Sequence, residues 1–351
     1  MQIDVLIVGQ GLAGSLLAWE LIRQQCRVLV LDNAQLNSSQ VAAGLINPVT
    51  GKRLLKAADM EILLPAAKLC YQQLSQAFAQ AFLIEMPMLR ILQNPNQQTY
   101  ALQRLQQQEY QPYLQAWQPA VDGIVAEFGV LPQTQTGYLR TQALLTALRT
   151  FFIAQGCYRQ VQLDYQDISL QPYLQWQDIQ SRHIVFCEGH QALANPWFGG
   201  LPFQLAKGEI LSCHTPDQYA RLILNYGHWF LPLPDGHFKT GATFSYGNTD
   251  TLPSQAAQDK LLSDLQQVCP QLKPVSITSH QAGIRPTTLD KQAFVGSHPY
   301  YKNLHIFNGF GAKGSLSIPW HALQLIAALT NQQPLPKTSD IQRYYATSFT
   351  A

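Results

Sequence analysis

The sequence predicts an α/β protein, α+β overall, that combines a parallel βαβ unit with a second sheet of mixed or antiparallel strands. Residues 3–32 follow the order strand, glycine turn, helix, strand, and apolar residues recur at helical spacing between the two strand segments. From residue 207 onward, short apolar segments are separated by turns such as Pro234-Asp235-Gly236, which indicates an antiparallel sheet. A chain of 351 residues is long enough for two domains.

The opening βαβ unit carries a complete G-x-G-x-x-G motif at residues 9–14, between its first strand segment and its helical segment. We expect Gly9 to allow a tight turn, Gly11 to let a pyrophosphate approach the backbone, and Gly14 to let the helix pack closely on the strand. The free N–H groups at the start of the helix would then face the phosphates.

The second strand of this unit, residues 27–31, is followed directly by Asp32, eighteen residues after Gly14. A carboxylate at this place can accept hydrogen bonds from ribose hydroxyls, and it disfavours a ribose 2′-phosphate, so NADP is not expected. Strand, glycine turn, helix, strand and acid together predict a Rossmann-type dinucleotide site. The alternative is a tight βα turn that binds nothing.

The segment after Asp32 combines hydroxyl groups with small residues, because Ser38 and Ser39 are followed by Ala42, Ala43 and Gly44. Such a segment can lie flat against a large planar ligand and donate hydrogen bonds to its phosphate or polyol. The alternative is an ordinary helix N-cap at one of the two serines.

The remaining elements are predicted from apolar periodicity and from turn residues. We expect helices at 59–82, 99–118, 137–156, 254–268 and 316–329. We expect strands or short β segments at 84–92, 159–163, 173–176, 183–190, 208–214, 221–225, 228–233, 238–244, 275–282 and 304–307, and a strand or a loop at 122–130.

Two later turns after predicted strands also contain glycine. The strand at 183–190 runs into Glu188-Gly189, which gives the backbone a second place to meet the dinucleotide. Residues 308–315, NGFGAKGS, open the last helix and include Lys313. A helix N-terminus with free N–H groups and a lysine would stabilise negative charge on a bound ligand. The alternative for Lys313 is a solvated surface lysine.

The composition is that of a globular protein with few charges: 46% of residues are hydrophobic, 13% are charged, and the net charge is +2. No long basic run is present, so no DNA footprint is expected. The six cysteines are scattered without a C-x-x-C pair, which argues against a disulfide framework, a metal site or a dithiol redox pair. No apolar run reaches membrane-spanning length. We therefore expect a cytoplasmic protein with reduced thiols and no membrane span.

Six segments, taken in order, resemble the D-amino-acid oxidase/glycine oxidase (DAO) superfamily of FAD-dependent oxidoreductases over nearly the whole chain. They are GQGLAG with Asp32, SSQVAAGL, the FCEG strand end, PLPDGHFKTGAT, GIRPTTLDKQAFVG and NGFGAKGS. The chain departs from the common pattern at Cys187-Glu188-Gly189, where relatives often carry Ala-Thr-Gly, and at 308–311, where a Gly-His-Gly-like run is common. Neither change removes a required glycine.

The resemblance implies a non-covalently bound FAD. The first glycine motif and Asp32 would hold the pyrophosphate and the adenosine ribose, and the last glycine-rich turn would lie near the pyrimidine end of the flavin. The residues implied to bind the cofactor are Gly9, Gly11, Leu12, Ala13, Gly14, Asp32, Asn33, Ser38, Ser39, Ala42, Ala43, Gly44, Leu45, Glu188, Gly189, Arg285, Gly309, Gly311, Ala312, Lys313, Gly314 and Ser315.

The resemblance also implies oxidation of a C–N bond in an amino acid or an N-substituted glycine, by hydride transfer to flavin N5 and hydrolysis of the imine. Arg285 matches the arginine that pairs with the substrate carboxylate in amino-acid-oxidising relatives, and a structural salt bridge is its alternative. The catalytic candidates are Arg285, Lys313, Tyr246 and Arg53, with Tyr226, His228, Trp229 and Lys239 as further candidates from the second sheet.

We expect a discontinuous FAD-binding domain from residues 1–80, 137–204 and 284–351, and a substrate domain from 81–136 and 205–283. The partners expected are a small amine or amino acid and an electron acceptor, either oxygen or a quinone. Two alternatives stay open. The first is an FAD-dependent oxidase that acts on a modified tRNA wobble uridine, and the second is a flavoprotein without catalysis.

Overall fold

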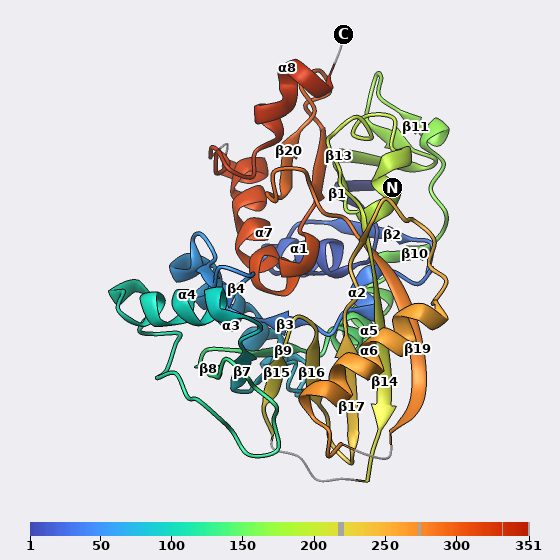
Figure 1. Cartoon of the computed structure of the whole chain (residues 1–351). Helices are drawn as coiled ribbons and strands as arrows, with labels where there is room; N and C mark the ends of the chain where they lie inside the picture. The colour runs from blue at the N-terminus through green and yellow to red at the C-terminus, as the bar shows by residue number, and fades with distance from the viewer. Residues whose placement is uncertain (217–220, 273–274, 332, 350–351) are drawn as a thin grey trace.

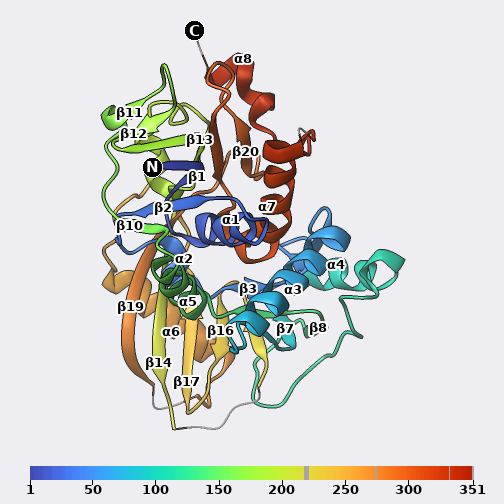
Figure 2. The same ribbon diagram turned by 180° about the vertical axis from the view of Figure 1, so that it is seen from behind.

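The computed structural model describes residues 1–216, 221–272, 275–331 and 333–349. Two large sheets lie in the upper and the lower half of the molecule in Figures 1 and 2, and the N-terminus and helix α8 Tyr345–Ser348 lie in the upper half. The helices α1 and α2 lie at the level where the two halves meet. The mixed α/β architecture with two sheets is the predicted fold class.

The first sheet has a parallel centre in the order β10-β2-β1-β13-β21. β20 pairs antiparallel with β21, and β12 and β11 extend the sheet as antiparallel strands beyond β13. The strands are β1 Gln2–Val8, β2 Val28–Asp32, β10 Tyr158–Gln160, β11 Ile168–Ser169, β12 Gln175–Trp176, β13 Ile179–Phe186, β20 Phe294–Ser297 and β21 Leu304–Asn308.

Helices cover one face of this sheet. They are α1 Leu12–Arg23, α3 Met60–Ala77, α5 Thr141–Ala154 and α7 Gly314–Asn331, and α1 and α3 both pack on α7. Their apolar faces share one buried cluster with the strand residues Val5, Ile7 and Val30, while Leu6 and Leu29 belong to a second cluster on the opposite face. Because both faces are covered, every residue of β2 is buried, which explains its continuous apolar run.

The second sheet has the order β18-β14-β17-β16-β15-β7-β8, and β19 pairs along β14. Helix α6 Gln255–Val268, capped by Ser254, packs on one face, and the opposite face is turned toward the first sheet. The strands are β7 Met88–Ile91, β8 Val130–Gln133, β14 Ala206–His214, β15 Ile223–Asn225, β16 Trp229–Pro232, β17 His237–Gly241, β18 Ser245–Tyr246 and β19 Ser276–Arg285.

Shorter elements make up the rest of the described chain. β3, β9 and β6 form a three-stranded sheet, and β4 pairs with β5. These elements are α2 Ser38–Val41, β3 Leu45–Ile46, β4 Val49–Thr50, β5 Leu55–Lys56, β6 Leu83–Glu85, α4 Pro95–Leu105, η1 Gln108–Tyr110, β9 Gly137–Leu139, η2 Tyr165–Asp167, η3 Gly189–Ala194, η4 Gly311–Lys313, η5 Ile341–Tyr344 and α8 Tyr345–Ser348.

The boundaries of several predicted elements were wrong, and three of these differences change how the chain is connected. The helix expected at 137–156 begins at Thr141, because Gly137–Leu139 forms β9 between β3 and β6. The helix expected at 99–118 ends at Leu105. The strand expected at 84–92 is interrupted around Pro87, which has no N–H to donate, and its two halves β6 and β7 belong to different sheets.

The strands of the first sheet all lie within the segments expected for the FAD-binding domain, and those of the second sheet lie within the substrate segments except for the last residues of β19. We propose this division as the domain organisation of the chain. The two bodies would meet along the face of the second sheet that looks toward α2.

One buried histidine in the first sheet leads us to predict how the free energy of unfolding depends on pH. His305 in β21 lies 3.0 Å from His183 (Nε2 to Nδ1) and 2.9 Å from the Ser297 hydroxyl (Nδ1 to Oγ). Burial, and then the nearby His183, lowers the pKa of His305 from 6.5 to about 3. The unfolded chain therefore takes up this proton first, and the free energy of unfolding falls as the pH drops from about 6.5 toward about 3, by at most about 1.4 kcal/mol per pH unit.

We predict that His305→Gln flattens this part of the pH dependence, because glutamine does not titrate. The measurement is urea unfolding of the protein at about pH 7 and about pH 5 for the parent and the variant. An unchanged difference between the two pH values in His305→Gln would contradict the assignment.

Candidate functional site

Two cavities lie at the carboxyl ends of β1, β2 and β13, and they share the lining residues Gly11, Ser39 and Cys187. The first cavity, of about 80 Å³, is bounded by the loops after these strands. The second, of about 370 Å³, lies between the start of α7, the segment after α2 and the second sheet. Because they share three lining residues, the two cavities are adjacent, at the strand ends where open α/β sheets bind ligands, and we call them together the groove.

The glycine turn at the start of this groove is required by close backbone contacts. Gly9 has φ +102°, and a Cβ atom there would lie 2.6 Å from the Cys187 carbonyl oxygen. A Cβ atom on Gly14 would lie 2.0 Å from the Gly9 carbonyl oxygen, so α1 can pack this closely only on a glycine. At Gly11 the nearest atom is Ser39 Oγ at 3.5 Å. Gly11 therefore leaves room above the backbone, where a ligand can approach.

Asp32 is held in place at the end of β2. Its Oδ1 accepts a hydrogen bond from the Gln10 N–H at 2.9 Å, and its Oδ2 accepts from the Ala34 N–H at 2.9 Å and from Arg149 at 3.1 Å. Oδ1 thus keeps a lone pair for a ribose hydroxyl. Arg149 also donates to the Gln10 side chain at 2.7 Å. Sequence reasoning missed Arg149, because it lies far along the chain in α5 and no local pattern marks it.

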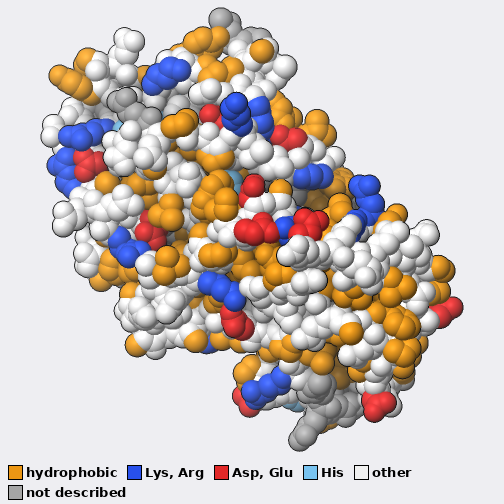
Figure 3. Space-filling model, turned by 90° about the vertical axis from the view of Figure 1, so that its left-hand side faces the viewer, with side chains coloured by type: hydrophobic (Ala, Val, Ile, Leu, Met, Phe, Trp, Pro, Cys, Tyr) orange, Lys and Arg blue, Asp and Glu red, His pale blue; other side chains and the backbone are white. Residues whose placement is uncertain are grey.

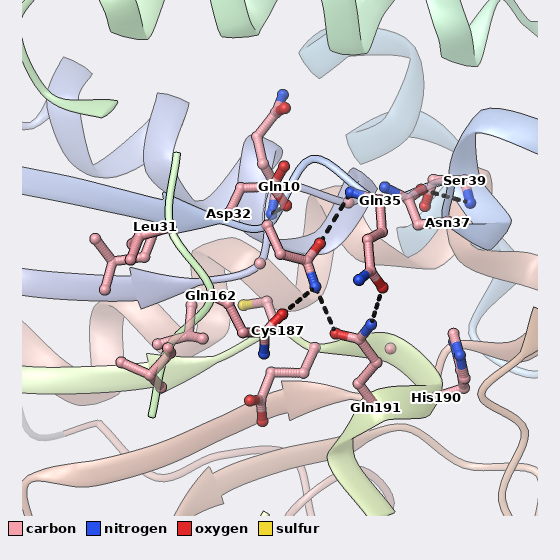
Figure 4. A pocket seen from close by; sticks show the side chains of 18 of the residues that line it. Gln10, Leu31, Asp32, Gln35, Asn37, Ser39, Gln162, Cys187, His190 and Gln191 are labelled. Carbon is pink, nitrogen blue, oxygen red and sulfur yellow. Dashed lines mark hydrogen bonds between the residues drawn. The ribbon is translucent and has the colours of Figure 1, made fainter. Parts of the chain in front are cut away.

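Side-chain amides cross the first cavity, as Figure 4 shows. The amide nitrogen of Asn33 donates to Gln162 at 2.9 Å and to Gln191 at 3.2 Å, and Gln191 donates to Gln35 at 3.1 Å. An amide both donates and accepts, so these side chains can pair with the polar edge of a heterocycle. Of the four, only Asn33 was predicted.

Glu188 lines the first cavity, but its carboxylate is directed at two neighbours. It accepts hydrogen bonds from the Tyr165 hydroxyl at 2.7 Å and from the Asn195 amide at 2.8 Å. Burial raises the pKa of Glu188 to about 7, although both hydrogen bonds act in the opposite direction. The side chain therefore fixes the turn that follows β13, and Gly189 lines the cavity beside it.

The second cavity brings together most of the remaining predicted residues. Ser39 Oγ accepts a hydrogen bond from the Leu12 N–H at 3.0 Å, which fixes the loop after β2 on the start of α1. The predicted residues that line this cavity are Gly11, Leu12, Ala13, Ser38, Ser39, Ala42, Ala43, Gly44, Leu45, Arg285, Gly311, Ala312, Lys313, Gly314 and Ser315.

The second cavity is electropositive. Arg285 and Lys313 are the charged side chains among its described lining residues, and no acid is among them. Burial lowers the pKa of Arg285 to about 10 and also lowers the pKa of Lys313. Within the described part of the chain, no carboxylate oxygen lies within 4.0 Å of either cation. This cavity therefore favours an anionic ligand.

Arg285 is held against the second sheet. Its guanidinium lies over the backbone of Gly208, where a Cβ atom would be 2.1 Å from Nη2. Its Nη1 donates to the Thr243 carbonyl oxygen at 3.3 Å, and its Cζ lies 5.0 Å from the centre of the Phe244 ring. These contacts leave other N–H groups of the guanidinium fork for a ligand.

Among the residues implied to bind the cofactor and the first four catalytic candidates, four line neither cavity: Gly14, Gly309, Arg53 and Tyr246. Gly14 serves the packing of α1, as its close contact with Gly9 requires. Arg53 is exposed, and Tyr246 lies on the edge strand β18 with 53% of its surface exposed. The structure thus does not bring these two catalytic candidates to the cavity.

Among the other candidates from the second sheet, only Trp229 lines the cavity. Tyr226 is buried and hydrogen-bonded to Thr240 at 2.9 Å, and His228 lies 3.0 Å from Asp264. Sequence reasoning missed four polar or polarisable residues that line this cavity, and no local pattern in the sequence marks them as ligand-binding residues. They are Asn47, Thr50, Met88 and Asn225.

No group of three or more histidine, cysteine or acidic side chains in the described ranges could hold a metal ion. Among the same residues, no helix combines the length and the apolar composition that crossing a membrane requires.

A family model described as FAD dependent oxidoreductase (DAO) matches residues 4–329. Glycine oxidase from Pseudomonas aeruginosa is 26% identical over 136 residues, which are 38% of this chain and 37% of that protein. The tRNA 5-methylaminomethyl-2-thiouridine biosynthesis bifunctional protein MnmC from Methylobacillus flagellatus is 25% identical over 255 residues, 63% of this chain and 38% of that protein. The matches thus span between 31% and 39% of the length of these curated relatives.

Solved structures show the same fold. Glycine oxidase from Geobacillus kaustophilus superposes with a TM-score of 0.83 at 19% identity, covering 100% of both chains. L-proline dehydrogenase from P. horikoshii superposes with a TM-score of 0.81 at 14% identity, covering 99% of both chains. At such identities the likeness establishes the fold alone.

The contacts of Gly14 and Gly11 predict different effects for two alanine substitutions. One should lower the stability of the protein, and the other should weaken its retention of FAD. Gly14→Ala places its methyl group against the Gly9 carbonyl, so we expect the free energy of unfolding to fall by about 2–5 kcal/mol. Gly11→Ala has room for its methyl group, so we expect stability within about 1 kcal/mol of the parent but weaker retention of FAD. Urea unfolding and the flavin-to-protein absorbance ratio after gel filtration measure the two effects. Equal losses of stability in both variants would contradict this division of roles.

Proposed function

The chain belongs to the family of FAD dependent oxidoreductases, and on that premise we propose that it oxidises the C–N bond of an amino acid or an N-substituted glycine. The observation that carries the proposal is Arg285, which lines the second cavity without a carboxylate partner among the described residues. A guanidinium fork binds a carboxylate through two parallel hydrogen bonds. The alternative role for Arg285 is a structural salt bridge. Among the described residues, no carboxylate forms a salt bridge with Arg285.

The residues of the groove fit FAD. The open backbone at Gly11 and the N–H groups that begin α1 suit the pyrophosphate, and Asp32 keeps an acceptor for the adenosine ribose. The small residues Ala42, Ala43 and Gly44 line the wider cavity, where a planar ring system needs space. When bound, FAD supplies a two-electron acceptor for hydride.

The proposed attachment of FAD is non-covalent. Cys187 is the cysteine that lines the two cavities, and it is buried. Burial raises the pKa of the Cys187 thiol well above its usual value. The thiol is therefore kept in its neutral, weakly nucleophilic form.

The chain's own residues would act mainly by binding and orientation. Arg285 would hold the substrate carboxylate from the side of the second sheet, and Trp229 and Ile210 would exclude water around the reacting carbon. Lys313 lines the cavity with a solvent-exposed side chain, and it would stabilise negative charge that develops beside the start of α7. Since no acid is among the described residues of this cavity, we propose that the amine enters in its neutral form.

The similarity to MnmC keeps a modified tRNA wobble uridine as the second candidate substrate. A tRNA would need a basic surface beside the cavity. On the face shown in Figure 3, Lys and Arg side chains are scattered among acidic, hydrophobic and neutral ones. This face therefore offers no extended basic surface of the kind that a tRNA needs. We further propose oxygen or a quinone as the electron acceptor, and a cytoplasmic location.

An anaerobic flavin-bleaching screen tests the proposed function. The purified holoenzyme is mixed with D-amino acids, L-amino acids, glycine, sarcosine, other N-substituted glycines, simple amines and bulk tRNA. Bleaching by an amino acid or an N-substituted glycine is the expected outcome, and readmission of air tests oxygen as the acceptor. Bleaching by tRNA alone would assign the second candidate function. No bleaching by any of these compounds would point to a flavoprotein without this catalysis.

For Arg285→Met we predict a fall of about 100- to 1,000-fold in kcat/KM for the substrate that the screen identifies, because the carboxylate loses a charged hydrogen-bonding partner. Arg285→Lys should recover part of the loss, since lysine keeps the charge but not the fork. Arg182→Met, whose side chain is 75% exposed, is the matched control and keeps the parental value. Steady-state kinetics of all three variants measure this, and a parental value in Arg285→Met would remove the assignment.

For Lys313→Met we predict a flavin reduction potential that is lower by about 30 mV or more, because the reduced flavin loses a neighbouring positive charge. Dye-coupled reduction of the bound flavin measures the potential without turnover. Lys337→Met, at an exposed position, is the matched control. Identical potentials in the parent and Lys313→Met would show that Lys313 does not act on the flavin.

A further inference from the structure

A second arginine lies behind the wall of the second cavity. Arg90 in β7 and Asn225 in β15 are register partners in a parallel pair of strands, and Asn225 lines the cavity. Arg90 is only 7% exposed, and its Nε is buried without a hydrogen-bond partner. In the ranges that the structure describes, no carboxylate oxygen lies within 4.0 Å of Arg90, and burial lowers its pKa to about 10. No described carboxylate thus offsets its charge, and its guanidinium lies next to Asn225, a residue of the cavity wall.

Arg90 fixes the orientation of the Asn225 amide. Its Nη1 donates to Asn225 Oδ1 at 2.6 Å. Because a guanidinium has donors and no acceptor, the oxygen of Asn225 must face Arg90 and the NH₂ group must face the other way. That NH₂ group lies 4.0 Å from Met88 Sδ, and Met88 also lines the cavity.

Asn47 presents a second NH₂ group to the same place. Its Oδ1 accepts a hydrogen bond from the backbone N–H of Val49 at 3.1 Å, which again is a donor only. Its Nδ2 lies 3.1 Å from Met88 Sδ, so both amides point at one sulfur atom. A thioether is a weak acceptor, and each NH₂ group therefore has hydrogen-bonding capacity left for a ligand.

This end of the cavity thus offers the NH₂ groups of Asn225 and Asn47 as hydrogen-bond donors, beside the guanidinium of Arg90, which has no described carboxylate partner. The complement of two NH₂ groups near a buried guanidinium is an acceptor that carries negative charge. Arg285 lines the same cavity and is assigned to another carboxylate. The cavity is then matched to a molecule with two anionic ends and an amine between them.

We propose that Asn225, held by Arg90, and Asn47 form a subsite for a second carboxylate, so that the substrate is an N-substituted glycine whose N-substituent ends in a carboxylate. Asn225 and Asn47 would contact the substrate, and Arg90 would be a positioning residue. The inference rests on the proposed function, because it takes Arg285 as the partner of the first carboxylate.

Three N-substituted glycines of similar size test the subsite. N-carboxymethylglycine has the second carboxylate, N-carbamoylmethylglycine has a neutral acceptor of the same shape, and N-isobutylglycine has no acceptor. We expect kcat/KM for N-carboxymethylglycine to exceed that for N-isobutylglycine by at least about 10-fold, with the amide between them. A value for N-isobutylglycine or for the amide at or above that of N-carboxymethylglycine would overturn the inference.

Asn225→Asp is the decisive variant. A carboxylate keeps the hydrogen bond from Arg90 and the shape of the side chain, but it replaces the NH₂ group by an acceptor with negative charge. We expect the ratio of kcat/KM for N-carboxymethylglycine over N-isobutylglycine to fall at least about 10-fold. Intrinsic differences between the two amines cancel when this ratio is compared between proteins. Asn303→Asp adds the same charge at an exposed position and should leave the ratio at its parental value.

Binding of a compound that cannot be oxidised gives a readout without turnover. Calorimetric titration of the holoenzyme compares diglycolate, which has an ether in place of the amine, with isobutoxyacetate. We expect diglycolate to bind at least about 10-fold more tightly in the parent and to lose this advantage in Asn225→Asp. If Asn225→Asp changes FAD retention while both ratios stay parental, the amide serves the flavin and the inference is overturned.

The outcomes separate the inference from the proposed function. If no amine bleaches the flavin but diglycolate binds selectively through Asn225, the dicarboxylate subsite stands and C–N oxidation fails. If N-isobutylglycine is oxidised as well as N-carboxymethylglycine, C–N oxidation stands and the subsite fails.

Discussion

The groove depends on one contact in which backbone packs directly on backbone at the end of β1. Gly14 lies against the Gly9 carbonyl, and Gly9 in turn lies against the carbonyl of Cys187. Any Cβ atom at either glycine would separate α1 from the strands, because the neighbouring atoms belong to the backbone and cannot rotate away. This close approach places the start of α1 at the strand ends, where Gly11 lines both cavities and Leu12 and Ala13 line the second.

The two cavities differ in charge, and the difference follows from what each element contributes. Loops after the parallel strands bring Asp32 and Glu188, and their carboxylates are already met by neighbouring donors. The second cavity receives Arg285 from the second sheet and Lys313 from the start of α7, without an acid among its described residues. A ligand that is rich in hydroxyls at one end and anionic at the other would suit this gradient.

The register of the strands in the second sheet determines which of its side chains face the second cavity, and therefore how polar that wall is. Side chains alternate between its faces, so Trp229 looks into the cavity while Phe230 joins the apolar cluster under α6. The parallel pairing of β7 with β15 sets Arg90 beside Asn225, although the two residues are 135 positions apart. The buried guanidinium then determines which end of the Asn225 amide faces the cavity.

The sequence by itself determined the βαβ unit, the two-sheet fold class and most of the groove, because a strand, a glycine turn and a helix are consecutive in the chain and each has a local physical signature. It did not determine which side chains of the second sheet reach the cavity. Tyr226, Trp229 and Tyr246 are equally suitable candidates in the sequence. In the structure Tyr226 is buried, Tyr246 is exposed on the edge strand β18, and only Trp229 of the three lines the cavity. Arg149, Arg90 and Asn225 acquire their roles only when distant strands and helices pack together, since a hydrogen bond depends on proximity in space and leaves no local pattern in the sequence.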